Sequence, residues 1–191
     1  MQEMNIAILG GCFDPPHLGH LWVVKQVLEF RPDIDRLLLM PAAQHQWKPI
    51  IALATDRVHM LQSFTDKKVV VSDLELKRKG VSYSVETIAE LGEMSKDKIY
   101  WIVGSDILSE FSRWKKAETL TNLATFLVFP RDPFSLPEKL PRGFEAIRDK
   151  ELITTNLSST LIRQRIKHEK SITGFVPEEV EQYIEEKGLY K

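Results

Sequence analysis

Residues 10–20 read Gly-Gly-Cys-Phe-Asp-Pro-Pro-His-Leu-Gly-His (GGCFDPPHLGH), and they follow directly on a short apolar run at residues 5–9. An apolar run of this length that ends in paired glycines is typical of a buried strand. From residue 18 to residue 30 the apolar side chains recur at helical spacing, so the stretch predicts a tight turn between a strand and a helix. Neither a turn nor a core requires this mixture of glycines, prolines and histidines, and we therefore expect the turn to bind a ligand.

The residue types in this turn suit a polyphosphate. Gly10 and Gly11 lack a Cβ, so a phosphate can approach their N–H groups closely. His17 and His20 lie in the predicted first helical turn, where the helix dipole favours an anion. An imidazole can donate a hydrogen bond there and, when protonated, offset charge. Two weaker interpretations are a structural turn with a histidine cap and a zinc site of Cys12, His17 and His20, which lacks the second half of a zinc motif.

Strands and helices alternate along the rest of the chain. This alternation predicts an α/β fold, a Rossmann-like doubly wound parallel sheet of five to six strands with C-terminal helices. Ligands of such folds bind beyond the carboxyl ends of the strands. The length fits one domain, residues 1–191. The predicted strands are 5–9, 36–40, 68–72, 99–103, 125–129 and 152–154, and the predicted helices are 18–30, 55–64, 84–94, 107–111, 117–123, 159–167 and 177–186.

The composition limits the partners and the compartment. A net charge of −1 and a pI of about 6.5 argue against DNA or RNA as the main partner. The N-terminal apolar run is too short for a signal peptide or a membrane span, and the lone cysteine, Cys12, fits a reducing compartment, so we expect a cytoplasmic protein without a membrane partner. We expect the proline-rich residues 130–150 to form a lid or a contact surface in a homo-oligomer, and the sequence leaves both open.

Two motifs resemble those of one superfamily. GGCFDPPHLGH resembles the G-x-F-x-P-x-H-x-G-H signature of the nucleotidyltransferases that include the HxGH-type adenylyltransferases, and Leu157–Arg163 (LSSTLIR) resembles their I-S-S-T-x-I-R box. On physical grounds Ser158 or Ser159 can also simply cap the helix that starts there. The resemblance implies that both motifs bind ATP phosphates and that His17, His20 and Arg163 are catalytic. The implied ATP-binding residues are Gly10, Gly11, Cys12, Phe13, His17, His20, Gly104, Asp106, Ser158, Ser159, Thr160 and Arg163.

The segments between the motifs resemble the nicotinate mononucleotide adenylyltransferases of bacterial NAD biosynthesis. The segments are Asp56–Leu61, Gly80–Thr87, Ile102–Asp106, Phe111–Trp114 and Val176–Tyr190. The resemblance implies an enzyme that transfers the adenylyl group of ATP to nicotinate mononucleotide, giving nicotinate adenine dinucleotide and pyrophosphate. Mg²⁺ would accompany ATP, and no protein side chain is assigned as a metal ligand. The implied acceptor-binding residues are Lys48, Tyr83, Ser84, Thr87, Asp106 and Trp114, with the indole of Trp114 stacked on the pyridine ring.

The chain departs from the family pattern at several positions. Cys12 stands where threonine is usual, Lys115 stands where an aromatic residue is frequent, and the basic group after the second strand is His45 or Lys48.

Two alternative functions stay open. One is a related adenylyltransferase that acts on nicotinamide mononucleotide or on another phosphate acceptor, such as pantetheine phosphate or a sugar phosphate. The other is a nucleotide-sensing module without catalysis.

Overall fold

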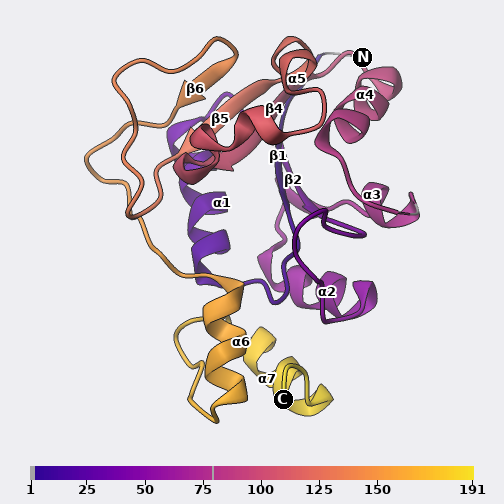
Figure 1. The fold of residues 1–191 in the computed structure, drawn as a ribbon, viewed down its shortest axis with the longest axis vertical. Coiled ribbons are helices and arrows are strands. Elements are labelled where there is room, and N and C mark those ends of the chain that lie inside the picture. Colours follow the sequence, from indigo (N-terminus) through magenta and orange to yellow (C-terminus); the bar gives the residue numbers. More distant parts are fainter. Residues whose placement is uncertain (1–2, 79) are drawn as a thin grey trace.

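The computed structural model describes residues 3–78 and 80–191. Its strands form one parallel, six-stranded sheet in the order β3-β2-β1-β4-β5-β6 (Figure 1). From β1 the chain moves outward to β3, returns to place β4 beside β1, and continues outward to β6. The switch point therefore lies between β1 and β4, and the predicted Rossmann-like sheet is confirmed. The strands are β1 (Asn5–Gly11), β2 (Arg36–Pro41), β3 (Val69–Val71), β4 (Lys98–Gly104), β5 (Thr125–Phe129) and β6 (Phe144–Ala146).

The helices agree closely with the apolar periodicity of the sequence. Four predicted helices, 18–30, 84–94, 117–123 and 159–167, have the same bounds in the structure. The predicted helix 55–64 begins one residue earlier and ends as a 3-10 turn, and the short helix α3 was not predicted. The helices are α1 (Leu18–Phe30), α2 (Ala54–Leu61), α3 (Leu74–Lys77), α4 (Ser84–Met94), α5 (Ala117–Leu123), α6 (Ser159–Lys167) and α7 (Glu178–Lys187), with 3-10 turns η1 (Gln62–Phe64), η2 (Ser105–Ser109) and η3 (Phe111–Arg113).

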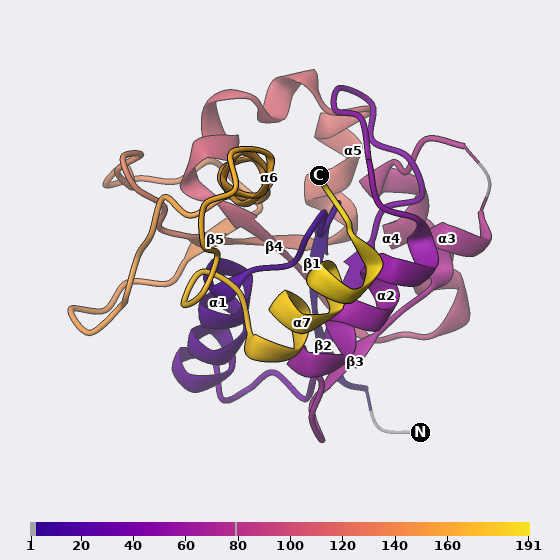
Figure 2. The ribbon, with the colours of Figure 1, turned by 90° about the horizontal axis from the view of Figure 1, so that it is seen from below.

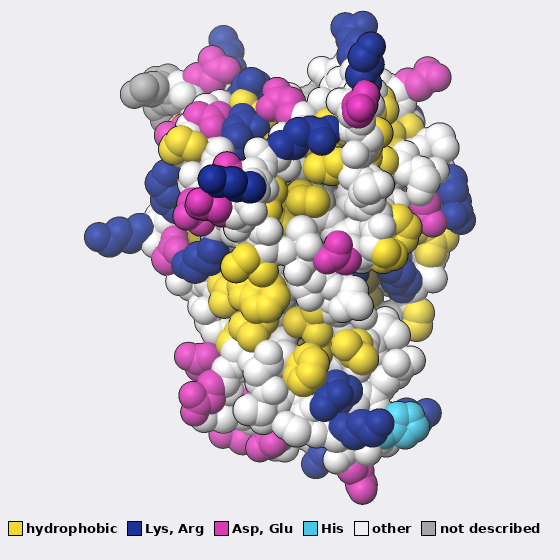
Figure 3. Space-filling model, turned by 90° about the vertical axis from the view of Figure 1, so that its left-hand side faces the viewer, with side chains coloured by type: hydrophobic (Ala, Val, Ile, Leu, Met, Phe, Trp, Pro, Cys, Tyr) yellow, Lys and Arg dark blue, Asp and Glu magenta, His cyan; other side chains and the backbone are white. Residues whose placement is uncertain are grey.

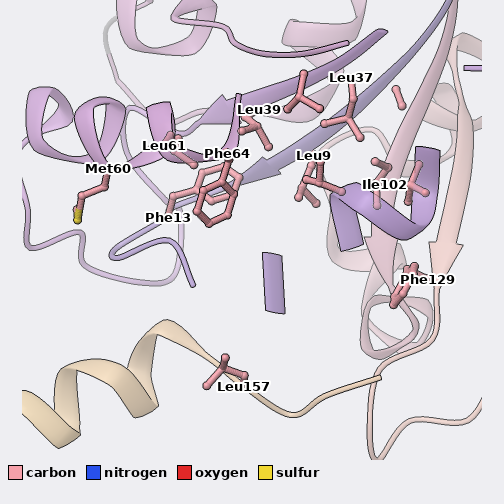
Figure 4. Close-up of a cluster of buried hydrophobic side chains, with 14 of the residues drawn as sticks. Leu9, Phe13, Leu37, Leu39, Met60, Leu61, Phe64, Ile102, Phe129 and Leu157 are labelled. Atoms are coloured by element: carbon pink, nitrogen blue, oxygen red, sulfur yellow. The ribbon is translucent and has the colours of Figure 1, made fainter. Parts of the chain in front are cut away.

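Apolar clusters cover both faces of the sheet. On one face the strands pack against α1 and α2, and side chains of α6 and α7 extend the same apolar cluster; on the other face the strands pack against α4 and α5. Successive strand residues point to opposite faces, so Leu9 belongs to the first cluster and Ile8 to the second. Phe13 extends the first cluster beyond the end of β1, where its ring lies beside the ring of Phe64 and near the side chain of Leu61 (Figure 4). The loop after β1 is thus anchored in the core.

The last strand is not where the sequence predicted it. Phe144–Ala146 pairs in parallel with Phe126–Val128 of β5, whereas residues 152–154 join no ladder. The side-chain amide of Gln26 in α1 instead donates to the carbonyl of Ile153 at 3.0 Å and accepts its N–H at 2.6 Å. One buried side chain thus satisfies the backbone that a neighbouring strand would otherwise pair. The prediction of a strand at 152–154 was wrong because apolar content alone does not show whether a backbone segment pairs with a neighbouring strand or with a side chain such as that of Gln26.

The C-terminal helices α6 and α7 lie beyond the carboxyl ends of the strands (Figure 1). Seen from below, the C-terminal end of the chain lies over the carboxyl end of β1 (Figure 2). The side of the molecule formed by the residues after β5 and by α6 carries interspersed acidic and basic side chains and several separate hydrophobic patches (Figure 3). In the part of the chain that the structure describes, no helix is both long and apolar enough to cross a membrane.

Candidate active site

A cavity of about 420 Å³ opens at the switch point between β1 and β4. The loops after β1 and β2, the turn before α4, the segments after β4 and β5, and the start of α6 line it. His20 from the first motif and Arg163 from the second both lie on its wall. The two motifs, remote in the sequence, therefore meet in one cavity. Of residues 130–150, Pro130 and Arg131 line this cavity.

The loop that follows β1 has a constrained backbone. A Cβ on Gly10 would lie 2.8 Å from the ring of Trp101 in β4, so this glycine is required by the packing of the neighbouring strand as well as by access to its N–H group. Phe13 adopts a left-handed conformation, with φ of 48°, although it carries a side chain. That side chain is 1% exposed and belongs to the core. Phe13 therefore anchors the loop through its ring.

The two histidines form a stacked pair on the cavity wall. Their ring centroids are 3.7 Å apart, and the backbone N–H of His17 donates to Nδ1 of His20 at 3.2 Å. This bond leaves the proton of a neutral His20 on Nε2. Burial lowers the pKa of His20 to about 3, and burial together with the neighbouring His20 lowers the pKa of His17 well below its usual value. Both rings are therefore neutral hydrogen-bond donors, and the charged form considered from the sequence is disfavoured.

The second motif clamps the first. Ser158 caps α6, since its Oγ accepts the N–H of Leu161 at 3.2 Å. The Ser159 hydroxyl donates to the carbonyl of Pro15 at 2.7 Å, and Nη1 of Arg163 donates to the carbonyl of Asp14 at 2.6 Å. These two side chains thus bind the loop itself, in addition to lining the cavity with the exposed Thr160.

The opposite end of the cavity is aromatic and basic. Trp114, Tyr83, Ser84 and Lys48 all line it, and both His45 and Lys48 reach it after β2. The half-buried indole of Trp114 packs edge-on against Phe126, with centroids 6.1 Å apart, which leaves the orientation of its ring defined. Helix α4 begins at Ser84 without a side-chain cap. This end combines aromatic faces with positive charge, which suits a flat ring that carries an anion.

Thr87 does not line the cavity, contrary to the role expected from the resemblance. The side chain has no exposed surface, and its hydroxyl donates to Oε1 of Glu75 at 2.7 Å while accepting Nη2 of Arg78 at 2.6 Å. Thr87 faces α3 instead of the cavity, because its hydroxyl bonds the side chain of Glu75 in that helix. Glu75, which the sequence did not single out, lines the cavity instead, and burial raises the pKa of its carboxyl.

Asp106 stands beside the switch point with one free oxygen. Its Oδ2 accepts Nη1 of Arg131 at 3.0 Å, while its buried Oδ1 has no hydrogen-bond partner. A Cβ at Gly104 would collide with this Oδ1, so the glycine keeps the carboxylate in place. The free oxygen can accept a hydroxyl of a bound sugar. Arg131 was not predicted, because nothing in its local sequence marks it. Among the described residues, no group of three His, Cys, Asp or Glu could hold a metal ion.

Cys12 and Arg57 support the loop from behind. Nη1 of Arg57, a residue that is 1% exposed, donates to the carbonyl of Cys12 at 2.8 Å. Burial raises the pKa of the Cys12 thiol, which keeps it protonated and argues against a nucleophilic role. Arg57 was not predicted as a site residue. The sequence offers one indication of its role, which is that a basic residue stands in a predicted helix beside residues that face the core.

Comparisons with known proteins identify the family of the chain. Residues 8–165 match the model of the cytidylyltransferase-like family. The chain is 37% identical to a protein of Opitutus terrae named "Probable nicotinate-nucleotide adenylyltransferase", with 98% of each chain covered. A protein of Thermus thermophilus with the same name is also 37% identical, with 98% of this chain and 100% of the relative covered.

Solved structures share the fold. The nicotinic acid mononucleotide adenylyltransferase of Plasmodium falciparum complexed with NaAD superposes with a TM-score of 0.83 at 20% identity, covering 98% of both chains. The same enzyme complexed with APC gives a TM-score of 0.78, again at 20% identity and 98% coverage of both chains. From the family match, and from relatives that align along nearly the whole length, the chain is a member of the cytidylyltransferase-like family and, within it, of the nicotinate-nucleotide adenylyltransferases.

Proposed function

We propose that this protein transfers the adenylyl group of ATP to nicotinate mononucleotide, releasing pyrophosphate and forming nicotinate adenine dinucleotide for NAD biosynthesis. The observation that carries the proposal is the shared cavity, whose wall brings together the glycines and histidines of the first motif, Arg163 of the second, and the aromatic and basic side chains of Trp114, Tyr83 and Lys48. The names of relatives at 37% identity along the chain support the same reaction.

The 5′-phosphate of the mononucleotide attacks the α-phosphorus of ATP, a new P–O bond forms in line with the bond that breaks, and pyrophosphate leaves with the electron pair. A phosphate oxygen is already a nucleophile at neutral pH, so no general base is required. Catalysis then depends on orientation and on donors aimed at the developing charge. His20 offers its Nε2–H and Arg163 its remaining guanidinium N–H groups to the phosphates.

The acceptor end of the cavity suits nicotinate better than its amide. Lys115 lines the cavity beside Trp114, and its Nζ lies 3.9 Å from the ring centroid of Tyr83. Lys48 adds a second ammonium on the opposite loop. A pyridine ring placed between Trp114 and Tyr83 would set its carboxylate near positive charge, whereas an amide gains little from such charge.

Mg²⁺ would enter bound to the ATP phosphates, where it supplies charge neutralisation and orients the leaving pyrophosphate. Oδ1 of Asp106, which has no hydrogen-bond partner and belongs to a residue that lines the cavity, is an oxygen that could contact this cation, since hard oxygen donors suit it. The carboxylate of Asp106 also holds Arg131, which lines the same wall and donates to phosphate or ribose oxygens.

The test is a steady-state comparison of acceptors with Mg-ATP. Pyrophosphate release is measured with nicotinate mononucleotide, nicotinamide mononucleotide and pantetheine phosphate, and the dinucleotide product is identified by mass. The proposal expects the highest kcat/KM with nicotinate mononucleotide. A higher value with another acceptor would indicate a related adenylyltransferase, and ATP binding without turnover on any of them would indicate a sensing module.

A further inference from the structure

Asp14 is the acidic residue of the loop after β1, and donors from two distant segments hold its carboxylate. Oδ2 accepts the N–H of Ile51 at 2.7 Å, and Oδ1 accepts the N–H of Ala52 at 3.0 Å. Oδ1 also accepts the hydroxyl of Tyr190 at 2.9 Å. Because the carboxylate residue is 1% exposed, these donors take the place of water around its charge.

Helix α7 ends in a geometry that sends Tyr190 back toward β1. Gly188 has φ of 61°, its N–H donates to the carbonyl of Glu185 at 3.2 Å, and the N–H of Leu189 donates to the carbonyl of Ile184 at 3.0 Å. This pair of bonds is the Schellman motif, which reverses the chain after a helix. Tyr190 itself has φ of 67°. Two left-handed residues within three positions thus direct the chain so that the Tyr190 hydroxyl reaches Asp14, in the loop after β1.

The loop needs external support. Phe13, immediately before Asp14, is in the left-handed region with φ of 48°, a conformation that a side chain with a Cβ disfavours. Such backbone persists only where its surroundings hold it. Arg57 and Ser159 hold the loop through the carbonyls of Cys12 and Pro15. The bond from Tyr190 differs from these two because it reaches the side chain of Asp14 and not a backbone carbonyl. The same carboxylate also accepts N–H groups from another part of the cavity wall.

That other part is the loop after β2. Ile51 and Ala52, which donate to Asp14, follow closely on Lys48 and Pro49, and both of these line the cavity. The carboxylate of Asp14 therefore fixes the loop that carries the two histidines against the loop that carries Lys48. The hydroxyl of Tyr190 is the side-chain donor that completes this junction.

We propose that Tyr190 is a positioning residue for adenylyl transfer: its hydroxyl holds the Asp14 carboxylate and thereby sets the distance between the phosphate-binding and acceptor-binding loops. The inference rests on the proposed function. Burial, followed by the charge of Asp14, raises the pKa of the Tyr190 phenol, so this group remains a donor over the pH range of an assay. Because small misplacements of reacting groups are costly in rate, the effect is expected in kcat.

The test is Tyr190→Phe, which removes one hydroxyl and keeps the ring. Steady-state kinetics with Mg-ATP and nicotinate mononucleotide give kcat and both KM values, and titration with a non-hydrolysable ATP analogue counts the functional sites. We expect kcat per functional site to fall about 10- to 100-fold, with much smaller changes in KM. A merely structural role would lower the number of sites or the Tm without changing the turnover of each remaining site.

The chain offers a matched control in Tyr183→Phe. The Tyr183 hydroxyl donates to Oδ1 of Asp56 at 2.9 Å, so this variant also removes a tyrosine–aspartate bond of α7, but one that does not reach the loop after β1. We expect its kcat to match that of the wild type. Unchanged kcat in Tyr190→Phe, or an equal fall in Tyr183→Phe, would overturn the proposal.

A double-mutant cycle tests the route through Asp14. In an Asp14→Ala background, which has no acceptor for the Tyr190 hydroxyl, adding Tyr190→Phe should lower kcat no further, whereas independent losses that multiply would contradict the mechanism. If Asp14→Ala does not fold, the comparison between Tyr190→Phe and Tyr183→Phe decides. A wild type without turnover on nicotinate mononucleotide would refute the proposed function instead. Hydrogen exchange at the N–H groups of Ile51 and Ala52, which donate to Asp14, would then test the junction itself: faster exchange confined to Tyr190→Phe supports it, and equal exchange in both tyrosine variants overturns it.

Discussion

The ring of His17 lies on the ring of His20, with centroids 3.7 Å apart and planes inclined by 27°. Two protonated imidazoles at this separation would repel each other, and burial disfavours charge on either. In the proposed reaction the pair would therefore face the ATP phosphates as neutral N–H donors. Donors that are already oriented stabilise developing charge without reorganising during the reaction.

His20→Ala is expected to lower kcat by about 10²–10³, the usual cost of losing one oriented donor, while the fold is retained. His20→Gln places an amide N–H near the position of Nε2, so it should keep more activity than His20→Ala. Steady-state kinetics on both variants, with circular dichroism to confirm folding, make the comparison. Equal activity in the two variants would show that donation from this position is unimportant, and near-normal turnover in His20→Ala would remove the residue from the catalytic set.

The same neutral pair makes stability depend on pH. An unfolded histidine has a pKa near 6.5, whereas the folded protein holds that of His20 at about 3. Between these values the unfolded chain binds a proton that the folded chain does not. The free energy of unfolding is therefore greatest above pH 6.5 and falls as the pH drops towards 3, by at most about 1.4 kcal/mol per pH unit for each imidazole.

Urea denaturation at a series of pH values measures this dependence, and His20→Gln serves as the control. Because glutamine does not titrate, the variant should lose part of the slope in this window. A slope that is the same in both proteins would mean that other groups, such as the carboxylates, account for all of it.

Lys115→Met is expected to reduce discrimination between the two mononucleotides. The ratio of kcat/KM for nicotinate mononucleotide to that for nicotinamide mononucleotide should fall roughly 5-fold, because a partly exposed ion pair contributes up to about 1 kcal/mol. The amide substrate is an internal control, since its own kcat/KM should change little. The measurement is a pair of acceptor titrations at saturating Mg-ATP.

Two further variants identify the charge as the cause. Lys115→Arg keeps the charge and should keep the discrimination. Nζ of Lys115 is 2.7 Å from Oε1 of Glu86, so Glu86→Gln frees the ammonium and should raise the ratio for the nicotinate substrate. If Lys115→Met leaves the ratio unchanged, the selectivity lies elsewhere in the acceptor end of the cavity.

Gly143→Ala tests how the segment after β5 packs. Gly143 has φ of 87°, and a Cβ there would lie 2.6 Å from Cβ of Thr121 in α5. We expect a loss of about 1–2 kcal/mol in unfolding free energy from the backbone and about 1–3 kcal/mol more from the overpacked contact. In Gly174→Ala, φ is 76° but no atom lies within 4 Å, so only the backbone cost should appear. If Gly143→Ala and Gly174→Ala lose the same unfolding free energy in chemical denaturation, the side chain of Thr121 moves aside without cost and the overpacked contact does not exist.

The local pattern predicted the helices well and the last strand poorly. Leu18–Phe30 and Ser84–Met94 carry an apolar face at helical spacing and were predicted to the residue. Phe144–Ala146 is a three-residue edge strand among prolines, and only its pairing with Phe126–Val128 makes it a strand. Such pairing is a property of the folded sheet, which a local pattern does not contain.

The candidate site shows the same division. The glycines, histidines and Arg163 were predicted because they stand in two compact motifs, and all of them line the cavity. Arg131 and Tyr190 escaped prediction because each acts through a single aspartate far away in the sequence. The structure places Thr87 against Glu75 and not on the cavity wall, and its expected contact with the acceptor stays a prediction, because the resemblance gives a residue's position in a motif but not where its side chain packs.

The sheet order has a consequence for how such a protein can change its acceptor. The β1 loop and α6 carry the two histidines and Arg163 of the cavity wall, whereas the turn before α4 and the segment after β4 carry Tyr83 and Trp114. The loop after β2 is shared, since it carries Lys48 while Ile51 and Ala52 donate to Asp14 of the β1 loop. Under the proposed function, replacing the turn before α4 or the segment around Trp114 would therefore adapt the scaffold to a new phosphorylated partner with the adenylyl donor held constant, whereas replacing the loop after β2 would disturb both substrates.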